Sequence, residues 1–475
     1  ATVRADGSST FSPDNRWGWF PSAALAWRVK NESFLSSVNW ISDAKLRLGW
    51  GLVGNQNAGS YAYGSTMTSV ATAWGTGFYP GNYSNSDLKW EETNSYNIGF
   101  DLALFNNRVE FIFDAYLKNT DNLLIKAALP NYISGVIASP WVNSGKMRNK
   151  GFEFTLNTVN ISNRDLTWTS NITFSLNRNK VLNLYTESSG MKGEVSINNK
   201  NEVITYTTIG NPVAQFYGYK VIGMFEKESD FYQKDANGDF ILDETGKPYF
   251  VALPEGKEIN EGTGIWYGDY IYADINGDGK IDEKDRTYIG DPEPSFTFGF
   301  NNTITWKGFD FNLFFTGSVG NDAYNYLRQD QSNPANRWAS LTDVTDFARV
   351  GMIDPEGERT FDNMCVLNPG SATYRIDQAD NNKNGRISSV FVEDASYLRI
   401  KNLALGYTLP KSLIGRIGIE NLRVYCNIQN LYTFTKYKGY DPEVGSLNQN
   451  VLLRGVDYAR YPSQRMFTFG LNVSL

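Results

Sequence analysis

The sequence predicts an all-β protein, a transmembrane antiparallel β-barrel, and three observations carry this prediction. Apolar and polar residues alternate with period two over many short segments, which is the side-chain period of a strand. Aromatic residues make up 15% of the 475 residues, and Gly and Asn are abundant, a composition that favours strands and turns over helices. Short and long connections alternate between the predicted strands.

The alternation is clearest in the segments 296–306 and 309–315. Phe296, Phe298 and Phe300 fall on one face of the first segment, opposite Thr297 and Gly299. A change of phase near residue 402 predicts a β-bulge. We predict eleven strands, at 21–29, 43–55, 94–105, 108–120, 149–161, 166–184, 296–306, 309–320, 397–410, 421–435 and 466–475.

The connections separate a membrane barrel from a soluble sandwich with one buried and one wet face. Long polar connections fall at every second join, whereas the joins between them are short or moderate. A sandwich gives no reason for every long loop to lie on one side, but outer-membrane barrels combine short turns on one rim with long loops on the other. The long connections are 56–93, 121–148, 185–295, 321–396 and 436–465, and the others are 30–42, 105–107, 162–165, 307–308 and 410–421.

The barrel prediction assigns the two faces of the strands. We expect the aromatic face to meet lipid and the polar face to line the lumen. The charged residues of the polar face could line a passage or form ion pairs against a plug, and we expect the ion pairs. The residues assigned to lipid are Phe296, Phe298, Phe300, Phe309, Phe311 and Phe315, and those assigned to the lumen are Asn301, Thr303, Asp310, Glu110, Asp114, Arg399 and Lys401.

The predicted strand number is odd, whereas single-chain bacterial barrels have even numbers of strands. Eleven is half of the 22 strands of the plugged outer-membrane barrels. We therefore expect residues 1–475 to be the C-terminal half of such a barrel, without the plug and the first half. The long loops would lie outside the cell and the C-terminus in the periplasm.

Composition excludes several classes of function. The formal net charge of −7 offers no basic field for nucleic acid. Histidine is absent, which removes Ser-His-Asp and Cys-His catalysis and His-ligated metals. The two cysteines have no metal-binding spacing, and no run of apolar residues is long enough for a transmembrane helix.

Several motifs resemble those of a known family. The segment "DLKWEETNSYNIGFDLALFNNRVEFIFDAYLKNTDNLL" (87–124) is similar to a strand-turn-strand signature of TonB-dependent receptors, and "NKGFEFTLN" (149–157) to the strand that follows. The segment "VEDASYLRIKNLALGYTLP" (392–410) resembles the hallmark of the SusC/RagA family of Bacteroidetes transporters. The segments "YKGYDPEV" (437–444) and "YPSQRMFTFGLNVSL" (461–475) are similar to the end of that family.

This resemblance implies a 22-stranded barrel with an N-terminal plug, a SusD-like surface lipoprotein as a lid and TonB as the source of energy. It implies import of oligosaccharides or peptides across the bacterial outer membrane. The plug, the TonB-contacting segment and the first half of the barrel are absent from this sequence. The expected partners are therefore the SusD-like lipoprotein, TonB through the missing part, the remaining half of the same barrel, the glycan or peptide substrate, and lipid.

The segment "DINGDGKIDEKD" (274–285) is typical of a calcium loop. Such a loop places oxygen donors at positions 1, 3, 5, 7, 9 and 12 with Gly at position 6. Here Gly279 is the turn residue, and Asp285 replaces the usual glutamate. The alternative is an Asx-turn loop that holds no ion. The predicted ligands of a structural Ca²⁺ are Asp274, Asn276, Asp278, Lys280 through its carbonyl, Asp282 and Asp285.

Aromatic residues in the long connections are candidates for contact with substrate or lid. The alternative is that they hold the loops together, because long ordered loops need small cores of their own. The candidates are Trp74, Tyr79, Trp266, Tyr267 and Trp338.

We conclude from the sequence that the protein is a non-enzymatic importer of nutrients. Two alternatives from other classes stay open. A secreted glycan-active enzyme needs only two carboxylates and no histidine. A calcium-stabilised adhesion or binding module would be expected to repeat its calcium loop, but the sequence contains one good loop.

Overall fold

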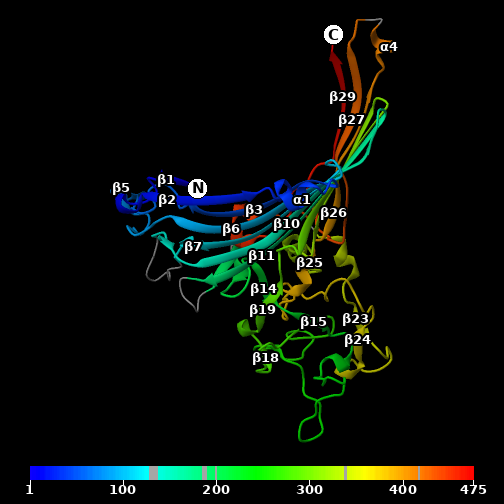
Figure 1. Cartoon of the computed structure of the whole chain (residues 1–475). Helices are drawn as coiled ribbons and strands as arrows, with labels where there is room; N and C mark the ends of the chain where they lie inside the picture. Colours follow the sequence, from blue (N-terminus) through cyan, green and yellow to red (C-terminus); the bar gives the residue numbers. More distant parts are fainter. Residues whose placement is uncertain (128–136, 185–189, 198–199, 336–339, 416–417, 475) are drawn as a thin grey trace.

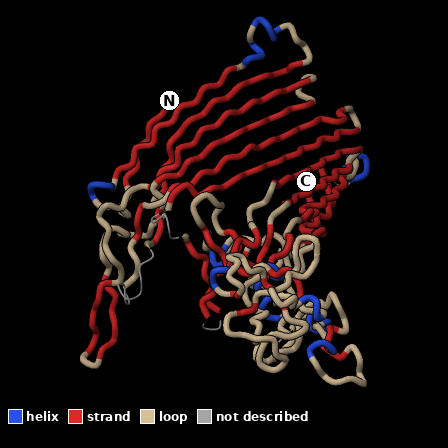
Figure 2. Tube along the Cα trace, turned by 90° about the horizontal axis from the view of Figure 1, so that it is seen from below, coloured by secondary structure: helices blue, strands red, loops and turns tan. Residues whose placement is uncertain are grey.

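One large antiparallel sheet forms the centre of the computed structural model, which describes residues 1–127, 137–184, 190–197, 200–335, 340–415 and 418–474. Twelve strands form this sheet in the order of the chain, each antiparallel to the next (Figure 2). They are β1 (Thr2–Gly7), β2 (Trp17–Trp27), β3 (Ile41–Asn55), β6 (Glu91–Leu104), β7 (Val109–Asp121), β10 (Lys146–Ser162), β11 (Leu166–Asn183), β20 (Phe296–Trp306), β21 (Phe309–Val319), β26 (Tyr397–Thr408), β27 (Asn421–Thr435) and β29 (Met466–Ser474).

The eleven predicted strands are all present, and a twelfth precedes them, so the argument from an odd number of strands does not apply. The missing strand is β1, whose residue Thr2 pairs with Ser22 and whose Gly7 pairs with Trp17. Its sequence, TVRADG, contains one large apolar residue, Val3, so period-two alternation is too weak to reveal it. This segment is a strand because its backbone hydrogen-bonds to β2, and no pattern in its sequence indicates that pairing.

The sheet is curved and open (Figure 1). Strands β1 and β29 form its two edges, and no pairing joins them among the described residues. It therefore has the form of a section of barrel wall and not of a closed barrel. The edge strands carry backbone N–H and C=O groups with no partner strand on one side, an arrangement that a closed barrel removes.

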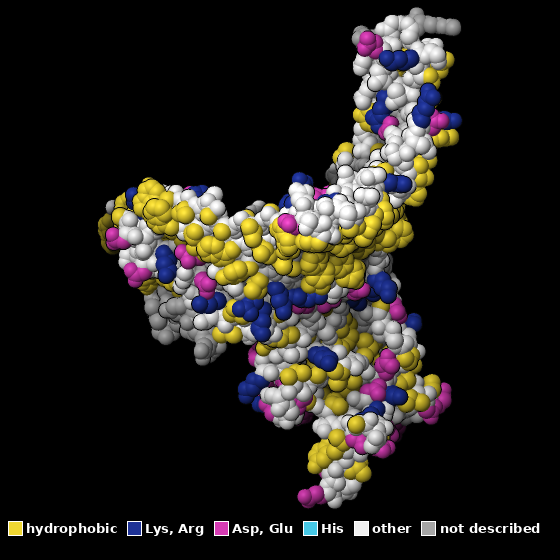
Figure 3. All heavy atoms as spheres, viewed as in Figure 1, with side chains coloured by type: hydrophobic (Ala, Val, Ile, Leu, Met, Phe, Trp, Pro, Cys, Tyr) yellow, Lys and Arg dark blue, Asp and Glu magenta, His cyan; other side chains and the backbone are white. Residues whose placement is uncertain are grey.

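The two faces of the sheet differ in polarity, as the alternation predicts. Phe300 pairs with Phe315 and Ile304 with Phe311, so aromatic and aliphatic residues of β20 and β21 share one face. These Phe side chains are half-buried or exposed. Figure 3 shows apolar side chains as a continuous band along the sheet. We call this face the apolar face and the opposite one the polar face.

Aromatic residues border the apolar face at the edge of the short turns. The rings of Phe309 and Tyr407 lie 4.4 Å apart, and those of Trp306 and Phe309 lie 6.1 Å apart. A register shift at Lys401, between Ile400 and Asn402, is the predicted bulge of β26. Rows of aromatics at the rims are typical of membrane barrels.

Every long connection leaves the same edge of the sheet. Because consecutive strands are antiparallel and neighbours, alternate connections must lie on opposite edges, which confirms the predicted grouping. In Figure 1 the connections that carry β14 (Gln215–Tyr219) to β25 (Val392–Asp394) form the mass below the sheet, β5 (Gly75–Pro80) lies at the left end, and the segment around α4 (Lys411–Ile414) lies at the top, away from that mass.

The long connections contain small sheets of their own. The described helices are α1 (Ser33–Ser36), α3 (Tyr326–Gln331) and α4, and none of them is long and apolar enough to cross a membrane. The small sheets are β12 (Met191–Ile197), β13 (Lys200–Thr207), β14 (Gln215–Tyr219) and β19 (Arg286–Gly290); β15 (Val221–Met224) with β17 (Tyr270–Tyr272); β16 (Leu253–Pro254) with β18 (Lys280–Ile281); β22 (Asp322–Asn325) between β25 (Val392–Asp394) and β28 (Val456–Asp457); β23 (Val350–Met352) with β24 (Met364–Val366); β4 (Met67–Thr72) with β5 (Gly75–Pro80); and β8 (Leu124–Lys126) with β9 (Trp141–Asn143).

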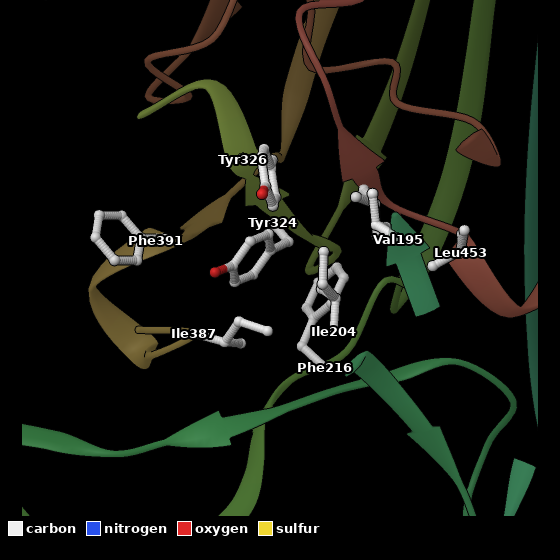
Figure 4. Packing of buried hydrophobic residues seen from close by; sticks show 9 residues of the cluster. Val195, Ile204, Phe216, Tyr324, Tyr326, Ile387, Phe391 and Leu453 are labelled. Atoms are coloured by element: carbon white, nitrogen blue, oxygen red, sulfur yellow. The ribbon is translucent and has the colours of Figure 1, made fainter. Parts of the chain in front are cut away.

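Three of the long connections pack into one assembly, which we call the loop assembly: residues 184–295, 320–396 and 436–465. One of its cores combines residues from all three, with Phe216 and Tyr324 fully buried at its centre (Figure 4). Burying aromatic side chains in this way fixes the long connections relative to one another. The core comprises Val195, Ile204, Phe216, Tyr324, Tyr326, Ile387, Phe391, Leu453 and Val456.

Candidate functional site: the polar face and the loop assembly

Amide side chains hydrogen-bond across strands on the polar face. Asn312 of β21 donates to Asn301 of β20 at 2.8 Å and accepts from Asn402 of β26 at 3.1 Å. Further along the sheet, Asn171 donates to Asn157 at 2.6 Å, and Asn157 donates to Glu110 at 3.0 Å. Such side chains can donate hydrogen bonds to, and accept them from, molecules that lie against this face of the sheet.

Two ion pairs on this face reach across an intervening strand. Arg47 of β3 contacts Asp114 of β7 at 2.8 Å, and Gly99 of β6 lies between them. A Cβ at Gly99 would lie 2.6 Å from the Arg47 guanidinium and from the Asp114 carboxylate. Because Gly99 has no side chain, the Arg47 guanidinium and the Asp114 carboxylate can contact each other above β6.

The second pair lies at the short-turn edge. Arg423 of β27 is the cross-strand partner of Thr408 of β26, and it reaches diagonally over Gly406 to contact Asp310 of β21 at 2.5 Å. A Cβ at Gly406 would lie 2.5 Å from Asp310 Oδ1 and 2.6 Å from Arg423 Nη2. These pairs lie within the chain, and the expected pairing of charges on this face with a plug stays a prediction.

Arg399 on β26 joins the sheet to the last long connection. Its guanidinium donates to Asp441, to Glu443 at 2.7 Å and to the Thr433 hydroxyl at 2.8 Å. Its side chain is 3% exposed, and that of Asp441 is 7% exposed. Burial alone would raise the pKa of the Asp441 carboxyl, but the N–H groups of Ser463 and Glu443 and the Arg399 guanidinium hold that pKa below its ordinary value.

Glu393 makes a second junction between the long connections. Its carboxylate accepts from Arg328 and from Asn325, both at 3.3 Å, and from the backbone N–H of Lys438 at 2.9 Å. Arg328 also contacts Asp343 at 3.2 Å. Charge-assisted hydrogen bonds to a carboxylate that is mostly buried hold these segments more firmly than exposed ion pairs would.

Asp269 lies at the centre of a third polar junction. Its fully buried carboxylate accepts from Arg375 at 2.9 Å, from Asn384 at 3.0 Å and from the backbone N–H of Trp266 at 2.9 Å. Burial raises the pKa of the Asp269 carboxyl, and Arg375 opposes this shift. The junction connects residues 184–295 with residues 320–396.

The predicted calcium loop is closed by its own backbone. Asp274 accepts from the N–H groups of Gly277 at 2.7 Å and Gly279 at 2.8 Å. The fully buried Asp285 accepts from Ile275 at 2.9 Å and Asp282 at 2.7 Å. Within the described residues, no three acidic or thiol side chains are grouped to hold a metal ion. The donors are therefore arranged as Asx turns, and coordination of Ca²⁺ would require their carboxylates to converge further.

The profile described as "TonB dependent receptor-like, beta-barrel" matches residues 1–288. The chain belongs to this family.

Individual TonB-dependent receptors are similar over nearly the whole chain. TonB-dependent receptor P3 of Formosa agariphila is 36% identical over 99% of this chain and 43% of its own length. TonB-dependent receptor SusC of Bacteroides thetaiotaomicron is 30% identical over 99% of this chain and 41% of its own length. This chain therefore spans less than half the length of these relatives.

The fold of this TonB-dependent receptor is also similar to a solved structure. The structure of the RagAB peptide transporter gives a TM-score of 0.74 with 26% identity, over 99% of this chain and 45% of that chain. The predicted resemblance to SusC and RagA is thus confirmed. These relatives are named as receptors and transporters and not as enzymes, in agreement with the predicted non-enzymatic character.

The aromatic residues predicted to contact substrate or lid differ in how deeply they are buried. Trp266 is 9% exposed and Tyr267 fully buried, which favours the alternative that they hold the loops together. Tyr267 donates to the Phe361 carbonyl at 2.8 Å, and its ring packs against Phe231 at 4.9 Å. Both residues hold the loop assembly together, because a long connection needs apolar burial to be ordered.

The other aromatic candidates lie outside that core. Trp74 is 96% exposed at the tip of the hairpin β4–β5, and Tyr79 is half-buried on β5. Trp338 lies outside the described residues. The sequence did not reveal the partners of Arg399 and Asp269, because they lie in segments far along the chain.

Proposed function

We propose that this chain is the C-terminal part of an outer-membrane importer that takes up oligosaccharides or peptides with energy from TonB. The observation that carries the proposal is the combination of a polar inner face with a loop assembly at one edge of the same sheet. Amides and ion pairs on that face suit a hydrated passage, while the apolar face suits lipid. The names of the relatives, SusC and the RagAB peptide transporter, support nutrient import.

The orientation follows from the topology. Outer-membrane barrels carry long loops outside the cell and short turns in the periplasm. The loop assembly would therefore be extracellular, including residues 185–295. The C-terminal strand β29 runs from the long-loop edge to the short-turn edge, so the C-terminus would be periplasmic.

The remaining half of the barrel is the first expected partner. Both edges of the sheet, β1 and β29, need strands to complete their hydrogen bonding, and the relatives are more than twice as long as this chain. The part of the receptor outside residues 1–475 would close the barrel, supply the plug and contact TonB. Neither half would form a pore alone.

A SusD-like lipoprotein is the expected lid over the loop assembly. The exposed Trp74, with Tyr79 on the same hairpin, is the described candidate for contact with this lid or with substrate. A two-stranded hairpin is marginally stable alone, so a partner surface would stabilise β4–β5. Substitution of Trp74 by Ala should weaken association with the lid without changing the amount of folded receptor.

Uptake by cells tests the proposed function. Cells that carry the full-length receptor should grow on the oligosaccharide or peptide fraction it imports, and growth should stop when either the receptor or TonB is removed. A receptor with Trp74→Ala is the graded variant, and Lys307→Ala at the short-turn edge is the matched surface control. Growth that is independent of TonB would contradict the proposal.

We also propose a structural Ca²⁺ at residues 274–285, held by Asp274, Asn276, Asp278, the Lys280 carbonyl, Asp282 and Asp285. The spacing of the oxygen donors and the turn at Gly279, with φ of +81°, support it. The ion would replace part of the N–H bonding that now satisfies these carboxylates. Equilibrium dialysis of the receptor against ⁴⁵Ca²⁺, with Asp278→Ala as the variant, tests it.

A further inference from the structure

Four cationic side chains form a square on the apolar face of the sheet, at the long-loop side. Arg148 and Lys150 lie on β10, and Lys180 and Arg178 are their direct cross-strand partners on β11. All four side chains are exposed. We call this group the basic square.

The side chains of the square lack anionic partners. Arg148 donates to the Asn119 amide at 2.8 Å, and Arg178 donates to the carbonyls of Pro294 and Ser295 at 3.2 and 3.0 Å. No ion pair joins any of the four to a carboxylate among the described residues; the nearby Asp121 is paired with Lys146 at 2.9 Å. Like charges directly opposite on neighbouring strands destabilise a sheet. An external anion would remove this repulsion.

The square borders the apolar band. Phe152 and Leu176 are a cross-strand pair one row further from the loops on the same face, and Phe154 and Phe174 follow. In Figure 3, Lys and Arg side chains lie along the edge of the apolar band that faces the loop assembly. Cations at this level are where lipid headgroups meet a membrane protein.

An apolar groove begins beside the square. It has a volume of about 680 Å³, within the range of small-molecule sites, and side chains of β2, β3, β6 and β7 line it. Leu117, in its wall, is the direct cross-strand partner of Lys150. Other residues of the wall are Leu25, Leu48, Trp50, Tyr96 and Ile98, which are 39–65% exposed.

We propose that the receptor binds a phosphorylated lipid of the surrounding leaflet at this place. Arg148, Lys150, Arg178 and Lys180 would hold the phosphates, and the groove would take an acyl chain. The basic square suits an anionic group and the groove next to it suits an apolar chain. The two features independently indicate one amphipathic anion. The inference rests on the proposed function in one respect, that the apolar face lies in a membrane.

Lipid binding by the full-length receptor in mild detergent tests this inference. The probes are bisphosphorylated lipid A, its dephosphorylated form and inorganic phosphate, measured by native mass spectrometry. The variant Lys150→Gln/Lys180→Gln should bind the phosphorylated lipid roughly twenty-fold to thirty-fold more weakly, since each interfacial cation contributes about five-fold. Ala115→Phe, which fills the groove, should weaken binding of the lipid.

Lys118→Gln is the matched control. Lys118 is exposed on β7 at the same height, paired with Asn149, but on the polar face. This variant should bind the lipid like the unchanged receptor. Weakened binding by Lys118→Gln to the same extent would overturn the assignment, because general charge and not the square would then determine affinity.

Three further outcomes would overturn the inference. The first is equal binding of the dephosphorylated lipid, and the second is full competition by inorganic phosphate at similar concentration, which would indicate a simple anion site. The third is a change of oligomeric state in the double variant without loss of lipid, which would assign the surface to a second copy. In a fourth outcome, the unchanged receptor would bind no phosphorylated lipid while its TonB-dependent uptake is intact, which would overturn this inference and leave the proposed function standing.

Discussion

Arg399 of β26 and Asp441 of the connection that follows β27 form a buried ion pair. The two residues are 42 positions apart, and each lies in a motif that resembles the SusC/RagA family, "VEDASYLRIKN" and "YKGYDPEV". The pair fixes the last long connection onto the polar face, and Glu443 adds a second carboxylate to the same guanidinium. These two motifs are therefore halves of one structural junction.

Removal of the Arg399 charge should loosen that junction. Arg399→Met leaves Asp441 buried without its cation, so the free energy of opening of residues 436–465 should fall by about 3–5 kcal/mol. Hydrogen exchange of this segment measures the change. Lys401→Met is the control, because the Lys401 ammonium is 39% exposed and 3.6 Å from Glu443, and its loss should cost about 0–1 kcal/mol. Equal effects of the two substitutions would contradict the junction.

Acid should weaken the same junction. The pKa of Asp441 is lower in the folded receptor than in an open segment, where it is about 3.9. Its contribution is therefore fully present above that ordinary value and is lost as the pH falls through the folded pKa. Hydrogen exchange of residues 436–465, corrected for the intrinsic rate, should show increased opening below about pH 4. Asp441→Asn should flatten this dependence, and an unchanged profile in that variant would assign it to other groups.

Substitution of Gly406 should break the second strand-spanning pair. The Cβ of Gly406→Ala would meet Asp310 and Arg423 at 2.5 and 2.6 Å, so the receptor should lose about 1–3 kcal/mol of stability. Thermal unfolding of the full-length receptor measures it. Gly415→Ala is the control, because no atom lies within 4 Å of an added Cβ there. If Gly406→Ala behaves like this control, the glycine does not serve the ion pair.

Calcium should protect the large connection from proteases. If the loop at 274–285 holds Ca²⁺, chelation should speed cleavage within residues 185–295 and leave the strands of the sheet intact, because the sheet does not depend on that loop for its hydrogen bonds. Asp278→Ala should be cleaved equally with and without chelator. Equal cleavage of the unchanged receptor in both conditions would mean that the loop is an Asx turn without an ion.

The sequence by itself determined the strands of the wall and the polarity of its two faces. On a pleated sheet, a period-two alternation such as that at Phe296–Phe300 assigns each side chain to one of the two faces. The alternation of short and long connections then determines which loops share an edge. The shift at Lys401 was visible because it interrupts that period. Strand β1 was not visible, because one large apolar residue gives no period.

Only the tertiary structure decided what the loop residues do. Trp266 and Trp74 are both aromatic residues in long connections, but the first is buried in the loop assembly and the second is exposed on a hairpin tip. Their difference depends on which distant segment packs over them, as do the partners of Arg399. Local periodicity indicates the backbone conformation of a segment and the face of the sheet on which each side chain lies. Burial and charge pairing, by contrast, arise from contacts between segments far apart in the chain.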